Sequence, residues 1–277
     1  MIDFHTHIFS PYIREHRKDL ATTDPFFSFV YADQGARMIG VEELIAAMEE
    51  GGVQQSVVCG SPWQGMELVR RENDYLLESA HKYPRQIIPF INLPQGEEDA
   101  IAELERCSAA GARGVGELAP GTYGDRLWPV ASMQSLFAAI KRKDLPVLIH
   151  VNESVGHPYP GKGSVGPAEI EALVNALKGI PTVLAHWGGG FFFYELMPEI
   201  AALCREVYYD TAASPFLYHR KIYTTAIGII GSDRIIFGSD YPLIPPERYK
   251  REMQEAGLTE AELAAILSLN AQRFLRY

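Results

Sequence analysis

The chain has 277 residues, 47% of them hydrophobic and 22% charged, which is typical of a globular protein and excludes disordered, collagen-like and coiled-coil chains. The 25 basic and 35 acidic residues give a formal net charge of −10. This balance argues against nucleic-acid binding, which normally requires a broad basic face.

The opening residues MIDFHTH resemble no export signal, and no apolar run approaches the roughly 20 residues that span a bilayer. The three cysteines, Cys59, Cys107 and Cys204, are odd in number and widely spaced. This pattern favours reduced core thiols over a disulfide framework. We therefore expect a cytoplasmic protein without a membrane partner.

Short apolar runs alternate along the chain with segments of helical periodicity. The predicted strands, in chain order, are 1–5, 55–59, 87–92, 114–118, 147–150, 182–186, 207–210 and 235–238. Helical spacing is clear in the intervening segments, for example at 41–48 and 170–177. Pro167 suits a first helical turn, and Thr259 with Glu262 matches a capping box.

Eight strands, about seven intervening helices and one closing helix predict an α/β protein of the (β/α)8 TIM-barrel type. We expect one domain over residues 1–277, because neither a linker nor a longer repeat interrupts the pattern. A doubly wound open sheet is the alternative, since periodicity does not separate a closed parallel sheet from an open one.

The segment 8–40 follows the first predicted strand and is rich in aromatic residues. It is read as one long irregular loop. Connections of this length are usually functional, so the segment is a candidate lid over a binding site.

Metal-capable side chains end several predicted strands. His5 and His7 lie two residues apart, so on a continuous strand both imidazoles point to the same side. Glu117, His150, His186 and Asp240 occupy the ends of later strands. A packed or surface role is the simpler interpretation of any one histidine, but the whole set points to one site, because all these ends converge on one face of a barrel.

Imidazole nitrogen and carboxylate oxygen without a nearby thiolate suit a catalytic divalent ion, with zinc first and manganese as a second choice. An unpaired carboxylate among barrel strands would be costly, and a bound cation removes that cost. Such an ion activates water and polarises a carbonyl group. Asp240 would then serve both as ligand and as proton acceptor.

At these positions the sequence resembles the amidohydrolase superfamily, in the amidohydrolase 2 branch that includes aminocarboxymuconate-semialdehyde decarboxylase. The matching motifs are Asp3-Phe4-His5-Thr6-His7, Leu148-Ile149-His150, Ala185-His186-Trp187-Gly188-Gly189-Gly190, Phe237-Gly238-Ser239-Asp240-Tyr241-Pro242 and the closing Asn270-Ala271-Gln272-Arg273-Phe274-Leu275. The resemblance implies that His5, His7, His150 and Asp240 bind the metal. It implies that His186 holds the attacking water or a substrate oxygen, or binds a second ion.

One position departs from many binuclear members of the superfamily. Where they carry a carboxylated lysine at the end of the fourth strand, this chain has Glu117, similar to the bridging glutamate of TatD-type deoxyribonucleases. Glu117 therefore either bridges two ions or supports a single one, and both readings stay open.

Three functions follow. The first is a metal-dependent hydrolase that attacks the carbonyl of a small amide, ester or lactone, with Asp240 and His186 as catalytic residues. The second is a non-oxidative decarboxylase of an unsaturated or aromatic acid. The third is a metal-binding barrel without turnover.

Residues that follow the metal-bearing strand ends are candidates for substrate binding, namely Asn152, Trp187 and Tyr241. The apolar run 191–193 is compatible with a homodimer contact.

Overall fold

The computed structural model describes residues 1–33, 35–63, 65–94, 97–119, 133–163 and 165–276. Eight strands form one sheet in which each strand pairs in parallel with the next along the chain. They are β1 (Ile2–Thr6), β2 (Gln55–Cys59), β3 (Ile87–Ile91), β4 (Gly114–Leu118), β5 (Val147–Ile149), β6 (Thr182–Leu184), β7 (Val207–Asp210) and β8 (Ile235–Ile236).

The first and last strands meet and close the ring. The Phe4 amide donates to the Phe237 carbonyl at 2.8 Å, and Thr6 forms a parallel bridge with Tyr241. This confirms the predicted (β/α)8 barrel and excludes the open doubly wound sheet.

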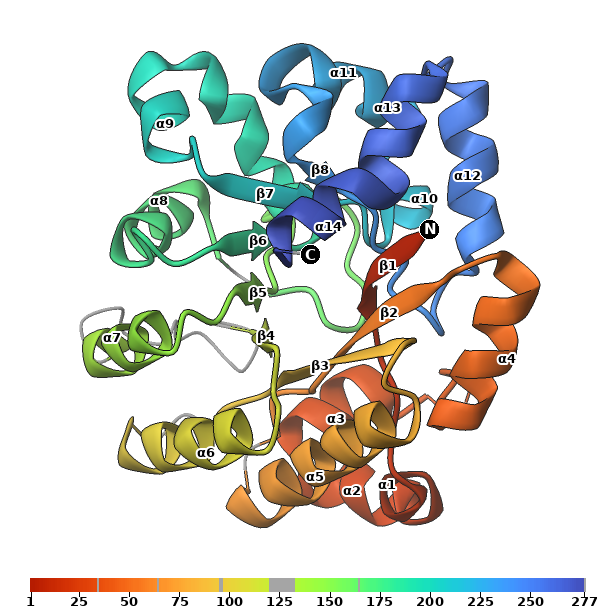
Figure 1. Cartoon of the computed structure of the whole chain (residues 1–277), viewed down its shortest axis with the longest axis vertical. Helices are drawn as coiled ribbons and strands as arrows, with labels where there is room; N and C mark the ends of the chain where they lie inside the picture. Colours follow the sequence, from red (N-terminus) through yellow and green to blue (C-terminus); the bar gives the residue numbers. More distant parts are fainter. Residues whose placement is uncertain (34, 64, 95–96, 120–132, 164, 277) are drawn as a thin grey trace.

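Helices lie outside the ring of strands (Figure 1). Those after the segment 8–40 are α4 (Val41–Gly51), α5 (Met66–Lys82), α6 (Glu97–Ala109), α7 (Gln134–Arg142), α8 (Pro167–Ala176), α9 (Pro198–Leu203), α10 (Ser214–Leu217), α11 (Ile222–Ile230), α12 (Pro246–Glu255), α13 (Glu260–Ala264) and α14 (Asn270–Phe274). Two 3₁₀ segments, η2 (His186–Leu196) and η3 (Ser232–Arg234), and one π turn, η4 (Ala265–Leu269), complete the described elements.

The predicted helix starts have the expected capping interactions. At the start of α13 the Thr259 amide donates to a Glu262 carboxylate oxygen at 2.7 Å, and the Thr259 hydroxyl oxygen accepts from the Glu262 amide at 3.3 Å. Pro167 occupies the first turn of α8, where its missing N–H costs no hydrogen bond.

The buried apolar residues form a large cluster between strands and helices and a smaller one among the strands themselves. The smaller cluster joins residues of six strands to Phe274 of α14. In Figure 1, α14 crosses the middle of the ring. The closing helix therefore packs against the side chains that fill the barrel interior.

The segment 8–40 differs from the predicted irregular loop, because it contains α1 (Pro11–Glu15), α2 (Arg17–Thr23) and α3 (Pro25–Tyr31). Ser10 and Asp24 cap α1 and α3, and a proline follows each cap. These helices of five to seven residues are too short to show a clear 3.6-residue pattern, and the capping residues are the signal that was missed.

This segment packs around aromatic rings and is tied to α5. The rings of Phe27 and Trp63 stack with centroids 5.8 Å apart. The Ser10 hydroxyl donates to the buried carboxylate of Glu72 at 2.5 Å, and the Ser10 amide donates to its other oxygen at 3.1 Å. The small core consists of Phe9, Ile13, Leu20, Phe27, Trp63 and Val69. The segment is therefore a packed unit beside the barrel.

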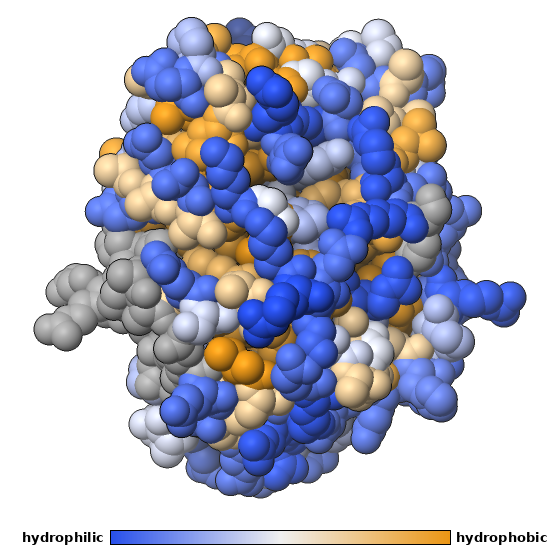
Figure 2. Space-filling view, turned by 60° about the vertical axis from the view of Figure 1, so that its left-hand side comes forward, coloured by the Kyte–Doolittle hydropathy of each residue, from blue (hydrophilic) through white to orange (hydrophobic). Residues whose placement is uncertain are grey.

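Polar and charged residues cover most of the side shown in Figure 2, with hydrophobic residues gathered in its upper half. A run of large apolar side chains on and after η2 is at least 42% exposed, comprising Phe193, Tyr194, Leu196 and Met197. The homodimer stays a prediction. Among the described helices, none has both the length and the apolar character that a bilayer crossing requires.

Candidate metal centre

The barrel brings the predicted metal-capable residues together at the carboxyl ends of its strands. His5 lies within β1 and His7 directly after it, whereas Glu117 lies within β4. His150 follows β5, His186 begins η2 after β6, and Asp240 follows β8. The parallel register, and not nearness in sequence, therefore assembles the cluster.

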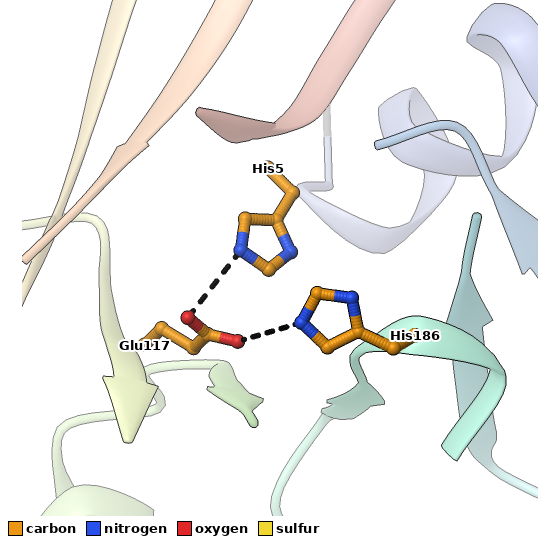
Figure 3. Close-up of side chains that lie close together, drawn as sticks. All are labelled: His5, Glu117 and His186. Carbon is orange, nitrogen blue, oxygen red and sulfur yellow. Dashed lines mark ion pairs between the residues drawn. The ribbon is translucent and has the colours of Figure 1, made fainter. Parts of the chain in front are cut away.

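Glu117 lies between histidines from opposite parts of the chain (Figure 3). Its Oε2 atom is 3.4 Å from His5 Nε2, and its Oε1 atom is 3.4 Å from His186 Nε2. The same Oε1 atom is 2.9 Å from His150 Nδ1. The carboxylate thus uses both of its oxygens within the cluster.

Asp240 faces the Nε2 atoms of His7 and His5. Its Oδ1 atom lies 3.4 Å from His7 Nε2 and 3.8 Å from His5 Nε2. The two Nε2 atoms are themselves 3.2 Å apart. Two groups of three ligand atoms therefore fit a metal ion, His5 with His7 and Asp240, and His5 with Glu117 and His186.

The remaining ring nitrogens show which atoms are free to bind a metal. His5 Nδ1 lies 2.8 Å from Asp210 Oδ2, His7 Nδ1 lies 3.3 Å from the Cys59 carbonyl, and His186 Nδ1 lies 3.2 Å from the Ala212 carbonyl. Carboxylate and carbonyl oxygens accept only, so each Nδ1 donates. The Nε2 atoms of the neutral imidazoles then carry lone pairs that face one another and the two carboxylates.

Such a convergence of acceptors is unfavourable unless positive charge lies among them. A divalent ion satisfies it, and hydrogen bonds from the distal nitrogens to a carboxylate or carbonyl are the usual support of metal-binding histidines. The donor set therefore fits a divalent cation. His150 is oriented differently, since its Nε2 lies 3.3 Å from the Gly161 carbonyl.

The pKa values of two histidines in the cluster are shifted by the neighbouring carboxylates. Burial acts to lower the pKa of His5, but the charges of Glu117 and Asp210 raise it well above its usual value. Burial also acts to lower the pKa of His186, but its hydrogen bond with Glu117 and the charge of Asp240 raise it to about 9. The carboxylates of the cluster therefore favour the protonated forms of His5 and His186.

The carboxylates shift in the opposite direction. Burial acts to raise the pKa of Glu117, but the charges of His5 and His150 lower it well below its usual value. For Asp240, burial is outweighed by the hydrogen bond with His7 and the charge of His5, so its pKa is also lowered. Both carboxylates are thus held in the ionised form that a metal requires.

Two residues of the cluster have left-handed backbone conformations, His186 with φ 54° and Asp240 with φ 60°. Such conformations cost about 1–3 kcal/mol each and persist where surrounding contacts enforce them. Here the His186 amide donates to Asp210 Oδ1 at 2.7 Å, and the Asp240 amide donates to the His5 carbonyl at 2.8 Å.

The turn that carries Asp240 is anchored to β1 by a buried carboxylate. Asp3 accepts from the Ser239 amide at 2.9 Å and from the Ser239 hydroxyl at 2.5 Å. Burial raises the pKa of Asp3 to about 7. A Cβ on Gly238 would lie 2.7 Å from His5 Cβ, so only glycine lets this turn approach β1 so closely.

A cavity of about 620 Å³ lies over the cluster, within the size range of small-molecule sites. His7, Glu117, His150, His186 and Asp240 line it at the strand ends. Its other walls include Phe26, Val30, Tyr31 and Arg37 from the segment 8–40, and Phe216, Leu217 and Leu243 from later connections.

The predicted substrate-binding residues Asn152, Trp187 and Tyr241 are not among the residues that line this cavity. Asn152 is buried and bonds with Gly163 through its amide oxygen and nitrogen. Trp187 is buried in the large core, and its indole N–H donates to the Ser214 hydroxyl at 2.7 Å. Tyr241 is also buried, with the Arg37 guanidinium 5.3 Å from its ring centre.

Two residues of the site were missed in the sequence. Asp210 ends the seventh strand and orients His5, and it carries the same signal that selected Asp240, an acidic residue at a strand end. Arg37 is the arginine among the cavity-lining residues. It follows α3 in a segment without periodicity, so no sequence pattern distinguishes it.

Comparisons with known proteins agree with this architecture. The family model described as Amidohydrolase matches residues 2–277. A gamma-resorcylate decarboxylase of Polaromonas sp. is 25% identical over 279 residues, which cover 86% of this chain and 84% of the relative.

Two solved structures show the same fold. The 2,6-dihydroxybenzoate decarboxylase from Rhizobium matches with a TM-score of 0.74 at 18% identity, covering 99% of this chain and 98% of that chain. A dihydroxybenzoic acid decarboxylase from Polaromonas sp., solved with manganese and the inhibitor 2-nitroresorcinol, gives 0.77 at 20% identity, covering 99% and 96%. These likenesses establish the fold alone, whereas the family model spans nearly the whole sequence. The chain therefore belongs to the amidohydrolase family, as the resemblance of its motifs predicted.

Proposed function

We propose that this protein is a metal-dependent lyase that releases carbon dioxide from an aromatic carboxylic acid without oxidation. The observation that carries the proposal is the convergence of imidazole and carboxylate acceptors at a cavity with largely apolar walls. Relatives named as decarboxylases of aromatic acids support this reaction over the hydrolysis that the sequence analysis placed first.

His5, His7 and Asp240 would hold one divalent ion, zinc or manganese, with Glu117 Oε2 beside it. One ion is proposed because both candidate groups use His5, whose Nδ1 is occupied by Asp210, and a single lone pair remains for a metal. When bound, such an ion would supply positive charge for the carboxylate of the substrate. His150 and His186, also in the predicted ligand set, act from the far side of Glu117.

The reaction requires a proton at the ring carbon that carries the carboxylate, before the carbon–carbon bond breaks and carbon dioxide leaves. His186 lines the cavity, and in the metal-free protein its hydrogen bond with Glu117 and the charge of Asp240 raise its pKa to about 9, which favours a proton on Nε2. Asp240 lines the cavity as an ionised carboxylate and is able to take up a proton and pass it on. We assign proton transfer to these two residues.

The cavity walls favour this chemistry over attack by water. Phe26 and Val30 of α3 lie on one wall, and Leu217 and Leu243 lie on others. Apolar walls limit the water that surrounds a bound ring and strengthen the electrostatic interactions inside. The single arginine among the lining residues, Arg37, supplies positive charge suited to an anionic substrate.

Product analysis tests the proposal. The purified protein, loaded with manganese or zinc, is incubated with 2,6-dihydroxybenzoate in ¹⁸O-labelled heavy water. We expect carbon dioxide and a ring product with one deuterium at the vacated carbon and no ¹⁸O. Hydrolysis of an amide, ester or lactone panel with ¹⁸O incorporation and no carbon dioxide would instead support the hydrolase, and no turnover would support the non-catalytic barrel.

A further inference from the structure

The cavity has a buried polar end at the strand ends, and its exposed rim mixes large apolar residues with polar ones such as Asp33, Arg37 and His157. His7, Glu117 and His186 at the strand ends are at most 8% exposed. At the other end, Phe216 is 50% exposed and Leu243 is 54% exposed, although both line the same cavity. Large apolar side chains at the mouth of a polar site are the kind of surface that contacts a ligand.

These mouth residues are held in fixed positions relative to the metal centre. The Leu243 amide donates to the Asp240 carbonyl at 2.8 Å, so Leu243 is tied to the turn that carries a proposed ligand. Arg248 holds the other side, because its guanidinium lies 5.2 Å from the Phe216 ring centre and donates to the Pro215 carbonyl at 3.1 Å.

The volume of the cavity exceeds what a simple ring acid fills. A water molecule occupies about 30 Å³ of liquid, so an acid of about ten non-hydrogen atoms takes up at most roughly 300 Å³. The cavity measures about 620 Å³. The cavity, whose lining includes Phe216, Leu217 and Leu243, therefore has room for a substituent on the ring.

We propose that the substrate carries an apolar substituent opposite its carboxylate and that Phe216, Leu217 and Leu243 bind this substituent. The inference rests on the proposed function, since it takes the carboxylate end of the ligand to lie at the strand ends. The polar residues Asp33, Arg37 and Tyr159 also line the cavity. Phe216, Leu217 and Leu243 form the apolar part of this rim, which is suited to an alkyl or aryl group, and they line the same cavity as the strand-end cluster.

The test compares 2,6-dihydroxybenzoate with the same acid carrying a propyl group at the 4-position. Calorimetry on the metal-loaded protein gives both dissociation constants, and steady-state assays give both KM values. Each methylene removed from water tightens binding by about fourfold, so the propyl compound is expected to bind at least about tenfold more tightly. Phe216→Ala and Leu243→Ala should remove most of this difference.

Leu269→Ala is the matched control, because Leu269 is 55% exposed but does not line the cavity, and this variant should keep the full preference. Equal affinity for the two acids, or a preference that survives both mouth variants, overturns the inference while carbon dioxide release still supports the lyase. A preference lost in Leu243→Ala without turnover of either acid supports the binding mouth and contradicts the proposed reaction.

Discussion

The carboxyl ends of the strands and the segment 8–40 meet at one cavity, but different interactions hold them. Strand-end residues such as His5 and His186 are fixed by backbone ladders and by the buried carboxylate of Asp210. The segment 8–40 is held by a small aromatic core and by Ser10 bonded to Glu72. The metal centre should therefore depend on electrostatics and the cavity wall on packing, so that each can be damaged separately.

The largest effect is expected from Asp240→Asn, which removes a ligand and a proton carrier at the strand ends. Loss of acid–base catalysis alone lowers rates by about 10²–10⁴, and metal affinity should fall with it. Carbon dioxide release and metal content measure the two losses. Asp99→Asn, at an exposed position on α6, is the control. An Asp240→Asn variant with more than a tenth of the activity would contradict both assigned roles.

Asp210→Asn tests whether the strand ends orient the imidazoles. The change keeps the shape of the side chain but removes the charge that faces His5 Nδ1 at 2.8 Å. Loss of such support typically lowers metal affinity by about 10- to 100-fold. Competition with a chelator measures the affinity, and circular dichroism verifies the fold. Unchanged metal affinity in a folded variant would show that Asp210 does not support the centre.

Metal affinity should also depend on pH in a defined direction. In the metal-free protein the charges of Glu117 and Asp210 raise the pKa of His5, a proposed ligand, well above its usual value, so an ion must displace a proton from His5. Metal affinity should then fall by about tenfold for each pH unit below that raised pKa per proton released. Titrations at several pH values, with proton release measured in weak buffer, check the sign. Affinity independent of pH between 6 and 8 would refute it.

Phe27→Ala tests whether packing holds the segment 8–40, which forms part of the cavity wall. Removing a buried phenylalanine ring typically costs about 3–5 kcal/mol, and if about 1.4 kcal/mol of this loss reaches ligand binding, substrate affinity falls about tenfold. Metal affinity should stay within about twofold of the wild-type value. Hydrogen exchange should rise in residues 8–40 and not in β1. A parallel loss of metal would mean that the wall and the centre form one cooperative unit.

The strand ends were predictable because barrel topology turns a strand position into a spatial position. The predicted strand 207–210 has the bounds of β7, and 114–118 has those of β4, so Glu117 was located correctly from sequence. Asp210 could have been selected on the same grounds, because it is an acidic residue at the end of a strand.

The direction of the Trp187 side chain could not be predicted from its position after a strand end. It follows His186, but residues 186–190 all adopt positive φ values from 54° to 83°, and this left-handed turn directs the indole into the core. A Cβ on Gly189 would lie 2.4 Å from the Asn152 carbonyl oxygen. The run Gly188-Gly189-Gly190 therefore signals an unusual turn, although it does not give the direction of the neighbouring side chain.

The cavity wall was predictable in location but not in detail. An aromatic-rich connection after the first strand indicated a cover for the site. Which of its residues face the cavity depends on the packing of short helices around Trp63, a residue outside the segment. Tertiary contacts of this kind leave no periodic trace, and this explains why Phe26 and Arg37 were not singled out.

Elemental analysis of the purified chain, before and after incubation with zinc or manganese, tests the central claim most directly. The account predicts close to one divalent ion per chain in the wild type and a marked loss in Asp240→Asn. A chain that takes up no ion under either condition would contradict it, because the converging acceptors of His5, His7, Glu117 and Asp240 would then be satisfied by protons alone.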